Sequence, residues 1–312
     1  MQDKPAQPLD PAADAEMQTM LDRYLPDRRP VSVDDYAWDQ VRPETLEPEF
    51  LEALGFVTLV ESNPSAPGQQ ILDAADRSQA RWLRRFVSQT WLPEEGMHHA
   101  PFKEYLIRVG AYQEQFLDAE IDKVVQRGFP HGEGYSDVQA ATYGWMQELI
   151  TWKFYDMLRS HLLSRQTTSQ PADPVMLRIL ADVAKQENFH RHIYLTGVKT
   201  ALKHSPQRRE EVVSAVAEFV MPGHLMAPDW QPKAPVWAEK FKFPLRGLAH
   251  DIVHGLVELT GHAGLGQASL QYGGRNKVHW ALRLPTSLAA PLSRFYNSPA
   301  NHIAGRFLAR ML

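Results

Sequence analysis

Residues 187–190 read ENFH, which places a glutamate and a histidine three positions apart. The same spacing recurs at residues 95–98, which read EGMH. Residues three apart on an α-helix share one face, so both side chains of each pair could approach a single metal ion. The spacing alone is weak evidence, because about one such pair is expected by chance in a chain of this composition.

The neighbours of the two pairs make the pattern more informative. The positions that share a helix face with Glu187 are almost all apolar: Met176, Ile179, Leu180, Val183, Tyr194 and Val198. The face that carries Glu95 is similar: Val87, Trp91, Leu92, Phe102 and Leu106. A carboxylate directed into an apolar core is costly unless a cation or a hydrogen-bond network compensates it. Both glutamates are therefore expected to face the core and to be compensated there by a cation or a hydrogen-bond network.

Two further glutamates follow the same rule. Glu148 lies in the nearly uncharged run 145–152, and Glu61 ends the apolar run 54–60. In chain order the candidate ligands are Glu61, Glu95, His98, Glu148, Glu187 and His190. One glutamate from each of two helices, with a Glu-x-x-His pair from each of two others, is the ligand set of a di-iron or di-manganese carboxylate bundle.

The chemistry of such a site explains its composition. Four carboxylates balance two divalent ions, and one imidazole per metal leaves positions open for dioxygen. A single inward-facing histidine is more often a hydrogen-bonded core residue than a ligand, so the prediction depends on the complete set.

The rest of the chain predicts an all-α fold, a helix bundle with extra helices. Helical patterns cover about 48–60, 69–110, 112–127, 137–163 and 175–202, and strand signals are scarce. Nine prolines in the first 67 residues indicate an extended leader with short helices over residues 1–45. We expect the bundle itself at 46–230 and a basic extension, packed on or beside it, at 231–312.

Composition limits the possible functions. The chain has 312 residues, 44 % of them hydrophobic and 22 % charged, and it contains no cysteine. Disulfides, iron–sulfur clusters and thiolate zinc sites are therefore excluded. The net charge of −4 disfavours a nucleic-acid partner, and no apolar run is long enough to span a bilayer. Because no targeting segment is visible at the N-terminus, we expect a cytoplasmic protein.

Charge is unevenly distributed along the chain. The last 54 residues have no acidic side chain but six basic ones, Arg275, Lys277, Arg283, Arg294, Arg306 and Arg310. Such a segment is either a docking surface for an acidic partner or a solvated tail that compensates acidic neighbours.

Several motifs resemble those of the soluble acyl-carrier-protein desaturases, over roughly residues 30–228. Residues 91–98, WLPEEGMH, resemble the family's W-x-A-E-E-N-R-H, and residues 146–151, MQELIT, resemble F-Q-E-x-A-T. Residues 186–190, QENFH, resemble D-E-x-x-H, and residues 60–64, VESNP, are similar to T-E-[ED]-[AN]-L-P.

This resemblance implies a ferritin-like di-iron helix bundle. The activity that it implies is that of an oxidase that uses dioxygen as co-substrate to insert a cis double bond into an acyl chain carried on acyl carrier protein. It also implies a ferredoxin or another electron donor, a possible homodimer, and a position for Thr151 in the oxygen pocket beside the metals. Two alternatives remain open. One is a di-iron hydroxylase or N-oxygenase of a carrier-bound or free substrate, and the other is a scaffold that binds a carrier protein without catalysis.

The sequence also departs from the family pattern. Val31 and Gln186 stand where the family has a tryptophan and an aspartate that form, with a ligand histidine, a plausible route for electrons. Within 91–98 the asparagine and arginine of the family pattern are Gly96 and Met97. Pro93 and Pro101 bracket the pair and are expected to bend its helix.

Overall fold

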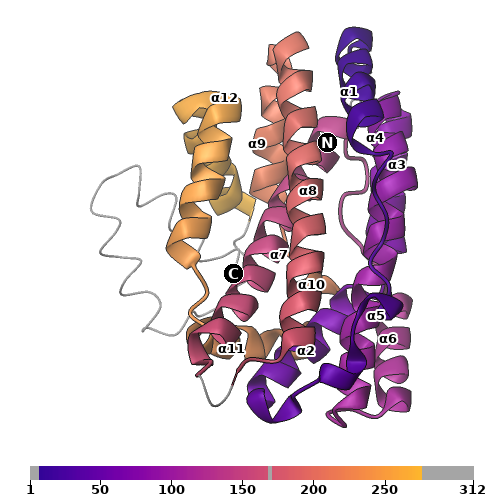
Figure 1. Cartoon of the computed structure of the whole chain (residues 1–312). Helices are drawn as coiled ribbons and strands as arrows, with labels where there is room; N and C mark the ends of the chain where they lie inside the picture. The colour runs from indigo at the N-terminus through magenta and orange to yellow at the C-terminus, as the bar shows by residue number, and fades with distance from the viewer. Residues whose placement is uncertain (1–6, 168–170, 276–312) are drawn as a thin grey trace.

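The computed structural model describes residues 7–167 and 171–275, and every regular element within these ranges is helical (Figure 1). The α-helices are α1 (Pro11–Tyr24), α2 (Pro48–Val60), α3 (Ser65–Arg77), α4 (Arg81–Phe86), α5 (Leu92–Arg108), α6 (Glu114–Arg127), α7 (Asp137–Arg165), α8 (Pro174–His204), α9 (Arg209–Glu218), α10 (Pro222–Met226), α11 (Ala234–Lys240) and α12 (Leu245–Arg275). The expected all-α helix bundle with extra helices is confirmed.

The two long helices α7 and α8 form the centre of the bundle and share its most extensive helix–helix contact (Figure 1). Both begin at well-defined caps. The Ser136 hydroxyl accepts from the backbone N–H of Gln139, whose side chain accepts from the Ser136 N–H, and the Asp173 carboxylate accepts from the N–H of Met176. Such caps satisfy backbone donors that the first turn of a helix leaves free. Helix α2 packs against α5 beside this pair.

The helix expected at 69–110 is wrong as a single element. The chain breaks after α3, where Ser78 closes the helix and Gln79 takes a left-handed φ of 54°. It resumes as α4 and passes through a π-helical turn, η4 (Val87–Trp91), into α5. Pro93 is the second residue after this turn. Because proline has no N–H, the register change occurs where one α-helical hydrogen bond is absent anyway.

The apolar interior consists of two clusters. Along η4 and α5, Trp91 belongs to one and Phe102 to the other; on α7, the same division falls between Leu149 and Tyr155. Glu95 and His98 lie between the first two positions, and Glu148 lies directly before Leu149. A polar layer therefore separates two hydrophobic cores, and the packing of these two cores holds the layer in place.

The flanking segments also pack on the bundle. The first forty-five residues contain α1, a helix of 14 residues against α4 and α8, followed by the 3-10 turns η1 (Val33–Asp35), η2 (Trp38–Gln40) and η3 (Pro43–Thr45). Within the expected extended leader with short helices, α1 is a regular α-helix, since Asp10 caps it and Met17 and Leu21 are buried on its inner face. The domain boundaries themselves stay predictions.

Beyond α8, the turns η5 (Pro206–Arg208) and η6 (Pro228–Lys233) connect short helices, and α12 packs mainly against α9. Of the six basic residues near the C-terminus, the side chain of Arg275 and the whole of Lys277, Arg283, Arg294, Arg306 and Arg310 lie outside the described residues. Within the described ranges, we find no helix with the length and apolar character needed to cross a membrane.

Candidate metal centre

Four helices bring the six predicted ligands together. Glu61 is the first residue after α2, and α5 contributes Glu95 and His98. Helix α7 contributes Glu148, and the second Glu-x-x-His pair comes from α8. All are buried except Glu61, whose side chain is 11 % exposed.

The six side chains form two overlapping groups. Glu61, Glu95, His98 and Glu187 form the first, which we term the outer group; Glu95, Glu148, Glu187 and His190 form the second, which we term the inner group. Within each group the ligand atoms all lie within 4.8 Å of one another. Glu95 and Glu187 belong to both groups, which is the placement that two bridging carboxylates require.

In both groups the histidine Nδ1 atom faces the carboxylates. Nδ1 of His98 lies 3.2 Å from Glu187 Oε1, 3.5 Å from Glu95 Oε2 and 4.0 Å from Glu61 Oε2. Nδ1 of His190 lies 2.9 Å from Glu95 Oε1 and 4.0 Å from Glu148 Oε2. The two imidazole rings stack at a centroid distance of 6.1 Å.

The inward-facing atoms of this cluster lack hydrogen-bond partners. Among the described residues, the unpaired buried atoms include Nδ1 of both histidines, Oε1 of Glu95, Oε2 of Glu148 and both carboxylate oxygens of Glu187. Leaving so many polar atoms unpaired in one core is costly, and two divalent cations would satisfy all of them. A donor set rich in carboxylate oxygen with one imidazole per ion suits iron or manganese better than zinc.

Four of the six side chains, those of Glu61, His98, Glu148 and His190, make hydrogen bonds through their outward-facing atoms. The Tyr155 hydroxyl donates to Glu61 Oε1 at 2.6 Å, and the Trp91 indole N–H donates to Glu148 Oε1 at 2.7 Å. Nε2 of His98 lies 2.8 Å from Gln186 Oε1, and Nε2 of His190 lies 2.8 Å from Glu94 Oε2. These contacts fix each ligand so that its free atom points into the cluster.

Burial and the close approach of charged groups shift the pKa values of the cluster's glutamates and histidines. Burial, with repulsion from neighbouring carboxylates, raises the pKa of Glu61 to about 8 and raises that of Glu187 well above its usual range. Burial also acts to raise the pKa of Glu95, but His98 and His190 outweigh it and lower that pKa. Burial would lower the pKa of His190, yet Glu94 and Glu95 raise it to about 9. Without metal, the cluster therefore holds several protons at neutral pH.

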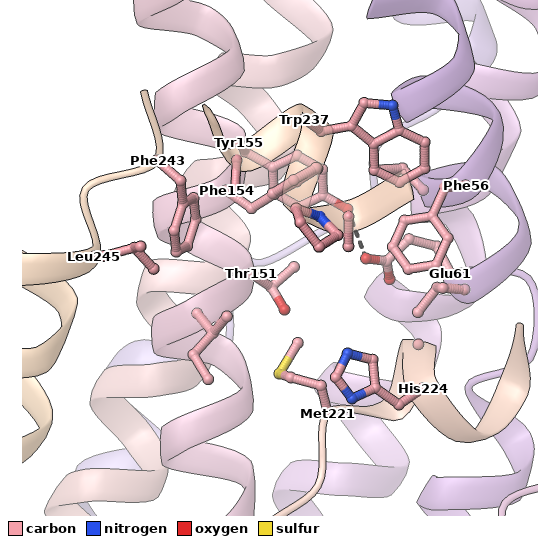
Figure 2. A pocket seen from close by; sticks show the side chains of 17 residues that line it. Phe56, Glu61, Thr151, Phe154, Tyr155, Met221, His224, Trp237, Phe243 and Leu245 are labelled. Atoms are coloured by element: carbon pink, nitrogen blue, oxygen red, sulfur yellow. Dashed lines mark hydrogen bonds between the residues drawn. The ribbon is translucent and has the colours of Figure 1, made fainter. Parts of the chain in front are cut away.

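A cavity of about 140 Å³ opens beside Glu61 (Figure 2). Thr151, one turn beyond Glu148 on α7, also lines it, and its hydroxyl donates to the Gln147 carbonyl at 3.0 Å. The remaining lining is mostly apolar: Phe56, Val57, Val60, Ile150, Phe154, Tyr155, Met221, Gly223, His224, Ala234, Pro235, Trp237, Ala238, Phe243 and Leu245. Residues 221–245 had no predicted role at the site, because nothing in their sequence spacing relates them to the ligands.

Glu94 was also missed by sequence reasoning. It is 1 % exposed and receives a two-point contact from Arg28, whose Nε donates to Oε1 at 2.9 Å and whose Nη2 contacts Oε2. Its adjacency to Glu95 in the sequence is no signal, since neighbouring residues on a helix point in different directions. Gln186, which stands where the family pattern has an aspartate, contacts His98 through Oε1, and its amide N–H donates to the Arg29 carbonyl.

A helix bundle with a buried cluster of four glutamates and two histidines defines the class of dimetal carboxylate proteins. The model of the fatty acid desaturase family matches residues 63–241, more than half of the chain, and the protein belongs to this family. The expected kinship with acyl-carrier-protein desaturases is thereby confirmed. Glu61 lies just before the matched range.

Curated relatives agree with this membership. The chain is 26 % identical over 158 residues to stearoyl-[acyl-carrier-protein] 9-desaturase 6, chloroplastic, of Arabidopsis thaliana. It is 24 % identical over 164 residues to the putative acyl-[acyl-carrier-protein] desaturase DesA1 of Mycobacterium tuberculosis. These alignments cover 49 % and 52 % of this chain but only 37 % and 46 % of the relatives, so the chain matches less than half the length of each.

Proposed function

We propose that the protein is an oxygen-dependent di-iron oxidase that introduces a cis double bond into an acyl chain carried on acyl carrier protein. The observation that carries this proposal is the apolar cavity that reaches Glu61 and Thr151 at the edge of the six-ligand cluster (Figure 2). An extended alkyl chain in this cavity would present its methylene groups to the cluster.

The residues present would hold two iron ions, with Glu95 and Glu187 shared between them. Such a pair, when bound and reduced, supplies with dioxygen an oxidant strong enough for an unactivated C–H bond. In the overall reaction the acyl chain loses two hydrogen atoms, and dioxygen takes these, two electrons from the donor and two protons to form water.

The protein's own contribution is to position the acyl chain and to exclude water from it. Phe56, Phe154 and Trp237 provide apolar walls that keep an alkyl chain extended and dry. Thr151 and Glu61 line the same cavity, and we assign to Thr151 Oγ1 the role of holding a proton near the reacting carbons.

Partners follow from the same proposal. The names of the relatives specify acyl carrier protein, and an acyl thioester is the substrate that we propose for this chain. The reaction needs two electrons, which a ferredoxin or another donor would deliver, and a homodimer is the proposed assembly.

Product analysis tests the reaction. Iron-loaded protein, given a saturated acyl carrier protein substrate, dioxygen and a reductant, should yield an acyl chain that has lost two hydrogen atoms by mass spectrometry. A product that has gained one oxygen atom would favour the hydroxylase alternative instead. About two bound irons without any product from a range of acyl substrates would contradict the oxidase and favour the scaffold.

The cavity itself can be tested on α11. Ala238→Phe should fill it and reduce turnover at least about tenfold without changing the iron content, because Ala238 lines the cavity and contacts no ligand. Val236→Phe is the matched control, since Val236 lies on the same helix but is 55 % exposed. Equal turnover in the two variants would show that the alkyl chain binds elsewhere.

A further inference from the structure

The two ligand groups are chemically identical in what faces the metals. Each has one histidine and one glutamate of its own, and each shares Glu95 and Glu187 with the other. Any difference between the two ions must therefore come from the contacts behind these ligands or from solvent.

The contacts behind the two histidines differ in charge. His190, in the inner group, has the carboxylate of Glu94 behind it, whereas His98, in the outer group, has the neutral amide of Gln186. If Nδ1 is the ligand atom, Nε2 carries the proton and donates in both cases. The amide orientation is fixed, because the Gln186 N–H group donates to the Arg29 carbonyl at 2.8 Å and leaves Oε1 to accept.

Glu94 is buried and is held as a carboxylate by its ion pair with Arg28. The Arg28 guanidinium makes its two-point contact from outside and stacks over the Phe189 ring at 3.9 Å from the centroid. An ionised acceptor behind a ligand histidine increases the electron density at the atom that binds metal, and an amide does so much less.

Solvent access reinforces the same difference. Glu61 of the outer group is 11 % exposed at the side chain and lines the cavity, whereas Glu148 of the inner group is 1 % exposed and receives the Trp91 N–H. The outer group thus has a neutral contact behind its histidine and the more accessible ligand glutamate.

We propose that the two metal positions are unequal: the inner position, formed with Glu148 and His190, binds a divalent ion first and more tightly, and Glu94 is the positioning residue that makes it so. The outer position, formed with Glu61 and His98, fills second and releases its ion more readily. This inference rests on the proposed dimetal site but not on the reaction assigned to it.

Metal titration tests the order of filling. Anaerobic calorimetry of the full chain with Fe²⁺, and in parallel with Co²⁺, should show two binding events of unequal affinity. Glu94→Gln should weaken the tighter event by about 10- to 100-fold and leave the weaker one nearly unchanged. Gln186→Glu should instead strengthen the weaker event, and as a gain of affinity it cannot be explained by misfolding.

Single-ligand variants assign the events to positions. Glu148→Ala should abolish the tight event and Glu61→Ala the weak one. Matched controls are Glu104→Gln, which removes a carboxylate that pairs with Arg108 elsewhere on α5, and Asn188→Asp, which adds one on α8 beside Arg191. Neither should change the affinities by more than about twofold.

Two outcomes would overturn the inference: two ions bound with equal affinity by the unaltered chain, or equal weakening of both events by Glu94→Gln. Neither outcome concerns the acyl reaction. Conversely, unequal binding with the expected effects of the variants, but without any acyl product, would support the inference and reject the proposed function.

Discussion

At the scale of single residues, the decisive feature is the orientation of each ligand side chain. Each of the six uses its outer atom for a hydrogen bond, or shares both atoms with the cluster, as Glu187 does. Since Glu95 and Glu187 contribute to both groups while Glu61 and Glu148 contribute to one, the ligands are not equivalent.

Metal content should follow this difference. Glu187→Ala removes a ligand from both groups and should reduce bound iron from about two ions per chain to nearly none. Glu148→Ala removes a ligand from one group and should leave about one ion per chain. Iron measured by mass spectrometry on anaerobically loaded protein gives both values, with Glu104→Ala as the control. Equal iron in the two variants would contradict the shared role of Glu187.

At the scale of helices, close packing depends on particular glycines. A Cβ atom on Gly197 of α8 would lie within 2.5 Å of Cζ2 in the Trp82 ring of α4, and one on Gly144 of α7 would lie 2.8 Å from the Tyr194 ring. A Cβ atom on Gly96, between the ligands of α5, would meet nothing within 4 Å. The first two glycines are needed for helix contact, and the third is not.

Two substitutions with the same chemistry should therefore have opposite effects. Gly197→Ala should lower the free energy of unfolding by about 1–3 kcal/mol, because the added methyl group overpacks a buried contact. Gly96→Ala should raise it by about 0.5–1 kcal/mol, since alanine restricts the unfolded chain and suits a helix interior. Urea unfolding of the metal-free proteins measures both. A Gly197→Ala variant as stable as Gly96→Ala would refute the contact with Trp82.

At the scale of the whole molecule, the polar layer between the two hydrophobic cores makes folding depend on protons or metal. Without metal, the raised pKa values of Glu61 and His190 mean that the folded protein binds protons more tightly than the unfolded chain does. Stability that depends on a raised pKa is present at low pH and is lost as the pH rises through the folded-state value.

The metal-free protein should accordingly become less stable between pH 6.5 and 8. In this window the folded protein still holds most of the protons on Glu61, whose pKa is raised from 4.5 to about 8, and on His190, whose pKa is raised from 6.5 to about 9, whereas the unfolded chain releases them. The metal-loaded protein should not weaken in this way, since metal ions replace the protons and bind better as the pH rises. Tm values of both forms across the window provide the measurement. A metal-free Tm that rises with pH would contradict the buried, proton-holding cluster.

The sequence alone predicted the all-α fold class and the six candidate ligands that meet in one cluster, but not Glu94 behind His190. Periodicity decides these, because an apolar face interrupted by a glutamate and a histidine three apart orients both side chains inward wherever the helix packs. It failed at the break after α3, where a left-handed Gln79 ends a helix that the apolar pattern would continue.

Tertiary structure decided everything that depends on which helices are neighbours. The sharing of Glu95 and Glu187, the cavity wall from residues 221–245, and the contact of Glu94 with His190 all join positions far apart in the chain. Local periodicity specifies the direction in which a side chain leaves its helix, but its partner is set by the packing of other helices, and no spacing within one segment encodes that partner.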